Sequence, residues 1–219
     1  MDKRIGASRR TNSSITKKFL DKVYNLKSQD QTNSFYKKWS STYDSELFEN
    51  GYITPKRCAD ALALLKINRN DPIIDIGCGT GLSGAALRDK GFTNIDGSDF
   101  SNEMLEIAKA KKLYHNLTLS TVEKPLNFDA DKYSHVAAVG VFSPLHASPE
   151  MIEKMLKVAK VGCHFVFSLN DHTLENPHYE GRIRLLLASG KAKVVYKEYG
   201  KHLPKIKLNA LIYVLERLK

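Results

Sequence analysis

The stretch Pro72-Ile73-Ile74-Asp75-Ile76-Gly77-Cys78-Gly79-Thr80-Gly81 is an apolar segment that runs into a glycine-rich turn. Its isoleucines predict a buried strand over residues 72–76. Gly77, Gly79 and Gly81 allow positive φ angles and a close approach of the backbone to a ligand. The helix expected from residue 82 presents unpaired N–H groups at its start. The turn between strand and helix is therefore predicted to bind a ligand.

A second acidic residue follows at the spacing of a strand-helix-strand unit. Residues 95–99, Ile-Asp-Gly-Ser-Asp, predict a strand that ends on Asp99, 22 residues after Gly77. In such units a carboxylate at this place binds the two hydroxyl groups of a ribose. The turn and Asp99 together predict an adenosine-containing ligand.

Two classes of adenosine cofactor fit this geometry. Residues 79–84, Gly-Thr-Gly-Leu-Ser-Gly, match the G-x-G-x-x-G pattern of dinucleotide-binding proteins. Asp75, however, lies two residues before the first glycine, where a carboxylate repels a pyrophosphate and attracts the ammonium of a methionine-like group. We therefore interpret the stretch as the S-adenosylmethionine loop of a class I methyltransferase, which releases S-adenosylhomocysteine as product.

The rest of the chain alternates between expected strands and helices. Helices are expected at residues 15–25, 34–43, 54–66, 82–90, 101–112, 149–160 and 176–189. Strands are expected at residues 72–76, 94–99, 117–121, 134–142, 163–170, 192–199 and 206–218. Thr54 and Ser101 are expected N-caps, with Pro55 at the first helical position.

This order of elements predicts an α/β fold. Alternating strands and helices indicate a doubly wound, mainly parallel sheet of seven strands. The last two strands follow each other without a crossover helix and must form an antiparallel C-terminal hairpin. We expect a basic tail and helical lid segment over residues 1–50, and the main domain over residues 51–219.

Further motifs resemble one methyltransferase family. They are Phe35-Tyr36-x-x-Trp39-x-x-x-Tyr43-Asp44, Gly97-Ser98-Asp99-Phe100-Ser101-x-x-Met104-Leu105-x-x-Ala108 and Val139-Gly140-Val141-Phe142-Ser143. With the glycine turn, residues 30–170 resemble the methyltransferase-like family that includes the Williams–Beuren-region protein. The resemblance implies a Rossmann-like class I fold and S-adenosylmethionine binding, without naming a substrate.

Two positions depart from the pattern of this family. Thr121 stands where an acidic residue commonly accepts a hydrogen bond from the adenine amino group, and its hydroxyl can still accept one. Tyr133 and Ser134 replace the Phe-Asp pair that usually opens the fourth strand. We expect cofactor affinity to survive both changes.

Each expected cofactor residue has a physical role. The glycines shape the turn, Asp99 takes both ribose hydroxyls, Asp75 helps to hold the ammonium, and Met104 either packs on the adenine or belongs to the core. Val139 and Gly140 would offer backbone carbonyls to the ammonium. The full set is Tyr36, Trp39, Tyr43, Asp75, Gly77, Cys78, Gly79, Thr80, Gly81, Asp99, Phe100, Met104, Thr121, Val122, Val139 and Gly140.

The aromatic residues of the N-terminal segment share one helix face. Tyr36, Trp39 and Tyr43 are spaced by three and four residues. They form either a lid over the cofactor, as the resemblance implies, or a stripe that packs on the sheet.

Two histidines are candidates for a general base. His146 follows the fourth expected strand, and His172 follows the fifth, at the strand ends where open sheets keep their sites. A base is needed only for a weakly nucleophilic acceptor. No metal site is expected, because the three cysteines lack ligand spacing.

Composition sets outer bounds on the protein. Its 219 residues with 42% hydrophobic content can bury one good core, and no apolar run is long enough to span a membrane. The odd cysteine count argues against a disulfide framework and favours a cytoplasmic location. Residues 1–20 hold six Lys and Arg against one Asp, which predicts a disordered basic tail or a transit peptide.

The net charge of +10 bears on the methyl acceptor. Residues 182–219 hold ten Lys and Arg against two Glu, which indicates either a solvated basic surface or an RNA contact. The motifs of amino-directed base methyltransferases, cytosine-C5 enzymes and protein-arginine enzymes are not apparent. We therefore expect a small-molecule acceptor. The alternatives are an RNA methyltransferase and a cofactor-binding protein without catalysis.

Overall fold

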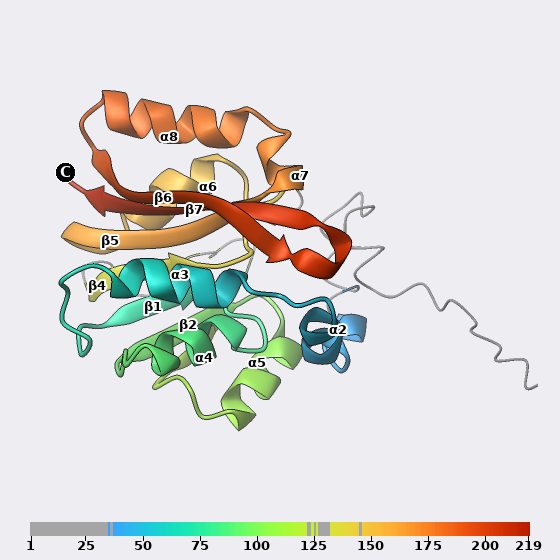
Figure 1. Cartoon of the computed structure of the whole chain (residues 1–219). Coiled ribbons are helices and arrows are strands. Elements are labelled where there is room, and N and C mark those ends of the chain that lie inside the picture. Colours follow the sequence, from blue (N-terminus) through green and yellow to red (C-terminus); the bar gives the residue numbers. More distant parts are fainter. Residues whose placement is uncertain (1–34, 36, 122–123, 125, 127–131, 145) are drawn as a thin grey trace, which may run out of the picture.

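A single mixed sheet organises the part of the chain that the structure describes. The structure is a computed structural model that describes residues 35, 37–121, 124, 126, 132–144 and 146–219. Within these residues the sheet has seven strands in the order β3-β2-β1-β4-β5-β7-β6 (Figure 1). The strands are β1 (Ile73–Ile76), β2 (Ile95–Asp99), β3 (Leu117–Leu119), β4 (Tyr133–Ala138), β5 (Ala159–Asn170), β6 (Ala192–Leu203) and β7 (Leu208–Arg217).

Strand β1 lies at the point where the order of the sheet reverses. It pairs in parallel with β2 on one side, where Ile73 is opposite Ile95, and with β4 on the other, where Ile74 is opposite Val136. All four residues of β1 are buried, which explains its unbroken apolar run. In open parallel sheets a ligand crevice forms beyond the carboxyl ends of the strands at such a reversal. The glycine turn follows β1 at this place.

Helices cover both faces of the sheet. Ile73, Ala137 and Val166 face helices α3 (Thr54–Ala63) and α4 (Leu82–Asp89). Ile74, Val136, Phe165 and their neighbours face α6 (Glu150–Leu156) and α8 (His178–Ala188) (Figure 1). The remaining helices are α2 (Tyr43–Glu49), α5 (Asn102–Ala110) and α7 (Asp171–Leu174), with a short 3-10 helix, η3 (Pro204–Ile206).

The C-terminal hairpin is antiparallel, as predicted. Strand β7 pairs antiparallel with both β5 and β6, and Val166 lies opposite Val214. Strand β6 continues through Gly200 to Leu203, further than the sequence predicts. The α/β fold with a mainly parallel doubly wound sheet is therefore confirmed.

Several expected boundaries were wrong. The fourth strand, expected to reach residue 142, ends at Ala138, because the chain turns at Gly140 with φ +72°. Thr54 does not cap α3: it is a buried helical residue whose hydroxyl lies 2.7 Å from His202 Nδ1. The predicted cap at Ser101 is confirmed, since its Oγ accepts a hydrogen bond from Met104 N at 3.2 Å. The helix expected over residues 15–25 lies outside the described residues.

A small apolar cluster joins the start of the described chain to the hairpin. Trp39 packs with Leu47 of α2 and with Leu203 and Leu208, which flank the turn between β6 and β7. Figure 1 shows α2 beside this end of the hairpin. Among the described helices, none combines the length and the apolar composition that crossing a membrane would require.

Candidate functional site

The glycine turn exposes backbone to an open space. Gly77, Gly79 and Gly81 have φ angles of +70°, +53° and +92°. A Cβ at Gly77 would lie 2.5 Å from Val141 Cγ2, so this glycine allows close packing against the chain after β4. A Cβ at Gly79 would meet no atom within 4 Å. Gly79 is therefore the position where a ligand can approach the backbone.

Asp99 lies against this turn at the end of β2. Its Oδ2 accepts a hydrogen bond from Gly79 N at 2.9 Å, and its Oδ1 accepts one from Ser101 N at 2.9 Å. Burial raises the pKa of the Asp99 carboxyl above its usual range, against the lowering effect of the amides that bind it. Two backbone amides thus fix the orientation of this carboxylate beside Gly79.

Asp75 is fully buried beneath the turn. Its Oδ2 accepts hydrogen bonds from Ser83 Oγ at 2.6 Å and from Tyr114 Oη at 2.8 Å. Its Oδ1 is buried and has no hydrogen-bond partner among the described residues. Burial raises the pKa of Asp75 to about 6. A carboxylate oxygen in this state is costly unless a polar group binds it.

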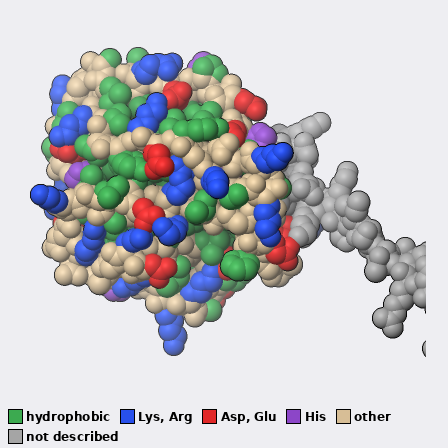
Figure 2. Space-filling model, in the orientation of Figure 1, with side chains coloured by type: hydrophobic (Ala, Val, Ile, Leu, Met, Phe, Trp, Pro, Cys, Tyr) green, Lys and Arg blue, Asp and Glu red, His purple; other side chains and the backbone are tan. Residues whose placement is uncertain are grey.

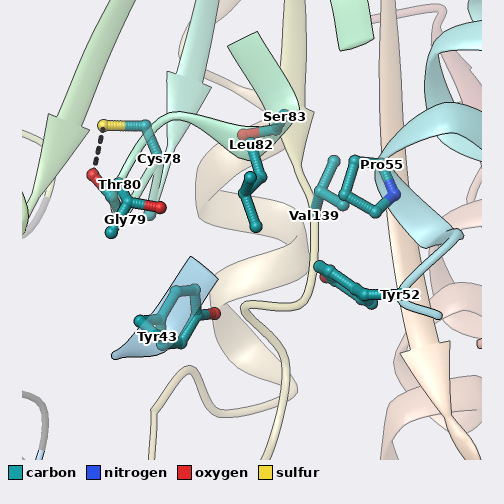
Figure 3. A pocket seen from close by; sticks show the side chains of 10 residues that line it. Tyr43, Tyr52, Pro55, Cys78, Gly79, Thr80, Leu82, Ser83 and Val139 are labelled. Atoms are coloured by element: carbon teal, nitrogen blue, oxygen red, sulfur yellow. Dashed lines mark hydrogen bonds between the residues drawn. The ribbon is translucent and has the colours of Figure 1, made fainter. Parts of the chain in front are cut away.

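A small pocket opens to solvent between the turn and two tyrosines (Figure 3). Tyr43 comes from α2, Tyr52 precedes α3, and Val139 follows β4. The other lining residues belong to the turn and to the first turns of α3 and α4. They are Pro55, Gly77, Cys78, Gly79, Thr80, Leu82 and Ser83. None of these ten residues is Lys, Arg, Asp, Glu or His.

The structure brings Gly77, Cys78, Gly79 and Thr80 of the predicted turn into this pocket, together with the predicted residues Val139 and Tyr43. Asp75 and Asp99 are not among its lining residues. Gly81 begins α4 as its N-cap, and Gly140 donates its N–H to Ser168 Oγ at 2.9 Å.

The predicted adenine-side residues lie outside this lining. Phe100 is 44% exposed, and Met104 is buried in α5. Thr121 is exposed, and its hydroxyl accepts a hydrogen bond from Lys124 N at 3.1 Å. Val122 lies outside the described residues.

The described aromatic residues of the N-terminal segment differ in their contacts with the pocket. Tyr43 lines the pocket, whereas Trp39 is buried behind it, with the two ring centroids 4.7 Å apart in an edge-to-face contact. Phe35 also packs against Trp39, with ring centroids 5.6 Å apart. Tyr36 lies outside the described residues. The single helix expected over residues 34–43 was wrong: the chain turns at residues 40–42, so Tyr43 begins α2 and does not share a helix face with Trp39.

Neither predicted base lines the pocket. His146 shares a short hydrogen bond between its Nδ1 and Ser143 Oγ, and burial lowers its pKa to about 4. His172 is exposed in α7, with its Nδ1 3.7 Å from Glu175 Oε1. Their roles in catalysis remain predictions.

Sequence reasoning missed the contribution of residues that come from distant segments. Tyr52 lines the pocket, and its ring contacts His202 edge to face with centroids 5.1 Å apart. A Cβ at Gly140 would lie 2.8 Å from the Tyr52 hydroxyl oxygen. The only sequence signal was the position of Tyr52 just before Thr54-Pro55. The sequence motif included Asp44 beside Tyr43, but it did not indicate that Asp44 binds Thr80 and Lys111.

Comparisons with known proteins agree with this geometry. The model of the methyltransferase domain family matches residues 73–162. Human methyltransferase-like protein 27 is 37% identical over 124 residues, which are 53% of this chain and 51% of that protein. The chain thus spans about half the length of the curated relative that it matches.

Solved structures share the fold. A chain from the complex between the Haloferax volcanii Trm112 methyltransferase activator and a methyltransferase aligns with a TM-score of 0.61 and 18% identity, over 82% of this chain and 96% of that one. Magnesium protoporphyrin IX methyltransferase from Synechocystis, solved with bound SAH, aligns with a TM-score of 0.56 and 18% identity, over 75% of this chain and 84% of that one.

Proposed function

We propose that this protein, whose residues 73–162 match the methyltransferase domain family and whose sheet has the class I strand order, transfers a methyl group from S-adenosylmethionine to an acceptor. The observation that carries the proposal is the pairing of Asp99 with the glycine turn. Asp99 Oδ2 binds Gly79 N at 2.9 Å, and the space beyond Gly79 is open. A carboxylate for ribose hydroxyls and an approachable backbone therefore lie side by side.

The buried polar groups fit S-adenosylmethionine better than a dinucleotide. Asp75 Oδ1 has no partner among the described residues, and Asp75 Oδ2 binds Ser83, which lines the pocket. A negative group beneath the turn favours a nearby ammonium and disfavours a pyrophosphate. When bound, S-adenosylmethionine supplies a methyl group on a sulfonium sulfur, which an acceptor displaces in line.

The remaining cofactor residues are assigned by their place around the turn. The backbone of Cys78 and Thr80 would line the methionine and ribose portion, and Val139 and Gly140 would face the ammonium. On the adenine side we propose Phe100, Met104, Thr121 and Val122. The hydroxyl of Thr121 is the acceptor for the adenine amino group in this assignment.

The lining of the pocket favours catalysis by positioning. Its titratable side chains among the described residues are Tyr43, Tyr52 and Cys78. Burial holds the pKa of the Cys78 thiol well above its usual range, so Cys78 stays protonated. A thiol or a low-pKa amine as acceptor needs no general base, and the walls of the pocket would align it and exclude water. For a weaker acceptor, His146 and His172 remain the proposed bases.

We propose a small molecule as the acceptor. The absence of Lys, Arg, Asp, Glu and His from the described lining favours an acceptor whose bound part is uncharged. The aromatic walls of Tyr43 and Tyr52 favour a planar or apolar group beside the methyl-bearing sulfur.

The basic C-terminal third gives limited support to an RNA acceptor. Several of its cations are paired with acidic groups: Lys191 with Glu153 at 2.8 Å, Lys193 with Glu216 at 3.0 Å, Lys197 with Glu180 at 3.2 Å and Arg182 with Glu150 at 3.2 Å. On the face that Figure 2 displays, Lys and Arg side chains are scattered, with Asp and Glu side chains among them. A phosphate-binding surface would need a continuous set of unpaired cations.

A product assay tests the proposal. The purified protein is incubated with S-adenosylmethionine and a panel of small thiols, amines and phenols, and release of S-adenosylhomocysteine is measured. The proposal predicts acceptor-dependent release by the wild type and none by Gly79→Val. If the protein binds S-adenosylhomocysteine but turns over no acceptor, the result would favour the alternative of a cofactor-binding protein without catalysis. An RNA acceptor would be indicated by RNA-dependent release, and by an RNA affinity that falls steeply with salt.

A cytoplasmic location is part of the same proposal. It is supported by Cys58, Cys78 and Cys163, which are buried free thiols. Free thiols are typical of a reducing compartment.

A further inference from the structure

One carboxylate connects helix α2, the glycine turn and helix α5. Asp44 Oδ1 accepts a hydrogen bond from Thr80 Oγ1 at 2.5 Å. Asp44 Oδ2 accepts one from Lys111 Nζ at 2.5 Å, and Lys111 is the C-cap of α5. Both partners are distant in sequence, so these contacts exist only while α2 lies against the turn.

The contact with Thr80 acts directly on the cofactor site. Thr80 lines the pocket and is 1% exposed. The backbone N–H of its neighbour Gly79 binds Asp99. Two successive residues of the turn are therefore each bound by a carboxylate, Gly79 by Asp99 and Thr80 by Asp44.

The same contact also fixes a wall of the pocket. Tyr43 precedes Asp44 and lines the pocket, with Trp39 packed behind it. If α2 moved away from the turn, the Tyr43 ring would move with it.

Helix α2 depends on such contacts. It has seven residues, its N-cap Thr42 makes no side-chain capping hydrogen bond, and its last turn has no basic residue. Helices this short are unstable in isolation and are held by tertiary contacts. Asp44 supplies two such contacts: it joins α2 to the glycine turn through Thr80 and to the end of α5 through Lys111.

We propose that Asp44 is a positioning residue for cofactor binding, which holds α2 and Tyr43 against the glycine turn through Thr80 and Lys111. The inference rests on the proposed function, because the ligand in question is S-adenosylmethionine or its product. The form with α2 held against the turn binds the cofactor. Loss of Asp44 lowers the population of this form and weakens the measured affinity in proportion.

A double-mutant cycle tests this inference, with S-adenosylhomocysteine as the probe in calorimetry. Asp44→Ala and Thr80→Val should each weaken binding about tenfold, which is roughly 1.4 kcal/mol. The double variant should bind no more weakly than Asp44→Ala alone, because Asp44→Ala already removes the contact with Thr80. Thr80→Ser keeps the hydroxyl and should recover most of the affinity.

A matched control separates this contact from general charge effects. Lys37 pairs with Glu103 at 2.8 Å, and this pair also joins the N-terminal segment to α5 but does not touch the turn. Lys37→Gln should bind S-adenosylhomocysteine as the wild type does. In the ligand-free protein, amide hydrogen exchange over residues 43–49 should be faster in Asp44→Ala and Thr80→Val than in Lys37→Gln.

The outcomes distinguish the two proposals. If the wild type binds the probe and the losses of Asp44→Ala and Thr80→Val simply add, or neither variant loses affinity, the positioning role is refuted. If the wild type does not bind the probe, the proposed function is refuted. In that case the exchange rates over residues 43–49 alone decide whether Asp44 holds α2 in place. Rates that are unchanged in Asp44→Ala would reject the positioning role of Asp44.

Discussion

Gly79→Val is the perturbation that separates binding from folding most sharply. Gly79 has φ +53° and a Cβ there would meet no atom within 4 Å, so the main cost of valine inside the protein is backbone strain. A non-glycine residue in the left-handed region costs about 1–2 kcal/mol, and valine is at the upper end because it is β-branched. For a chain of this size, that loss lowers the melting temperature by roughly 2–8 °C.

The effect on the cofactor should be much larger. The valine side chain would occupy the open space beyond the turn and keep the ligand from the backbone. Overpacking of a filled site costs roughly 1–3 kcal/mol, and displacement of the ligand from Asp99 adds to it. We expect affinity for S-adenosylhomocysteine to fall about 100-fold or more in calorimetry.

Gly91 supplies a matched control. It also has a positive φ, +83°, and open space at its Cβ, but it lies in the turn before β2, away from the pocket. Gly91→Val should show a similar loss of thermal stability with unchanged cofactor affinity. Equal affinities for the wild type and Gly79→Val would refute the assignment of the glycine turn. Equal affinity losses in Gly79→Val and Gly91→Val would show that the loss does not depend on the position of the valine in the glycine turn.

Three further predictions concern Asp99, His135 and the N-terminal segment. Asp99→Ala should weaken S-adenosylhomocysteine binding by about 1.5–3 kcal/mol, the value of charge-assisted hydrogen bonds, and unchanged calorimetric affinity would remove its ribose role. Burial lowers the pKa of His135 to about 4, so the unfolded state binds more protons between pH 4 and 6.5 and stability falls as pH decreases through that window. Between pH 7 and pH 5 this histidine should contribute a loss on the order of 1–2 kcal/mol in urea unfolding, and His135→Gln should lose correspondingly less. If residues 30–50 form a lid, amide protection over residues 37–49 should rise on adding S-adenosylhomocysteine, and deletion of residues 1–45 should leave a folded domain that binds poorly; equal protection with and without ligand would leave only a packing stripe.

Local patterns were enough to predict the elements around β1. The apolar run of residues 73–76, the glycines of the turn and the cap at Ser101 each have a cause within a few residues. The parallel order followed from the alternation of strands and helices. The end of β4 was missed because the apolar residues continue beyond Ala138, although Gly140 turns the chain.

Contacts between distant segments could not be predicted in the same way. Threonine is a preferred N-cap residue, yet the hydroxyl of Thr54 binds His202, 148 residues away. Asp44 finds Lys111 only because the sheet order brings α5 beside the glycine turn. Tyr52 lines the pocket for a similar reason, because its ring contacts His202 in strand β6 of the hairpin. Such partners are fixed by topology and not by local sequence.

Cofactor identity is the central claim, and a calorimetric titration tests it most directly. The wild-type protein is titrated with S-adenosylhomocysteine and, in a parallel cell, with NAD⁺, the dinucleotide that the G-x-G-x-x-G pattern would otherwise indicate. We predict saturable binding of one S-adenosylhomocysteine per chain and no saturable binding of NAD⁺. Binding of NAD⁺, or no saturable binding of S-adenosylhomocysteine, would contradict the account.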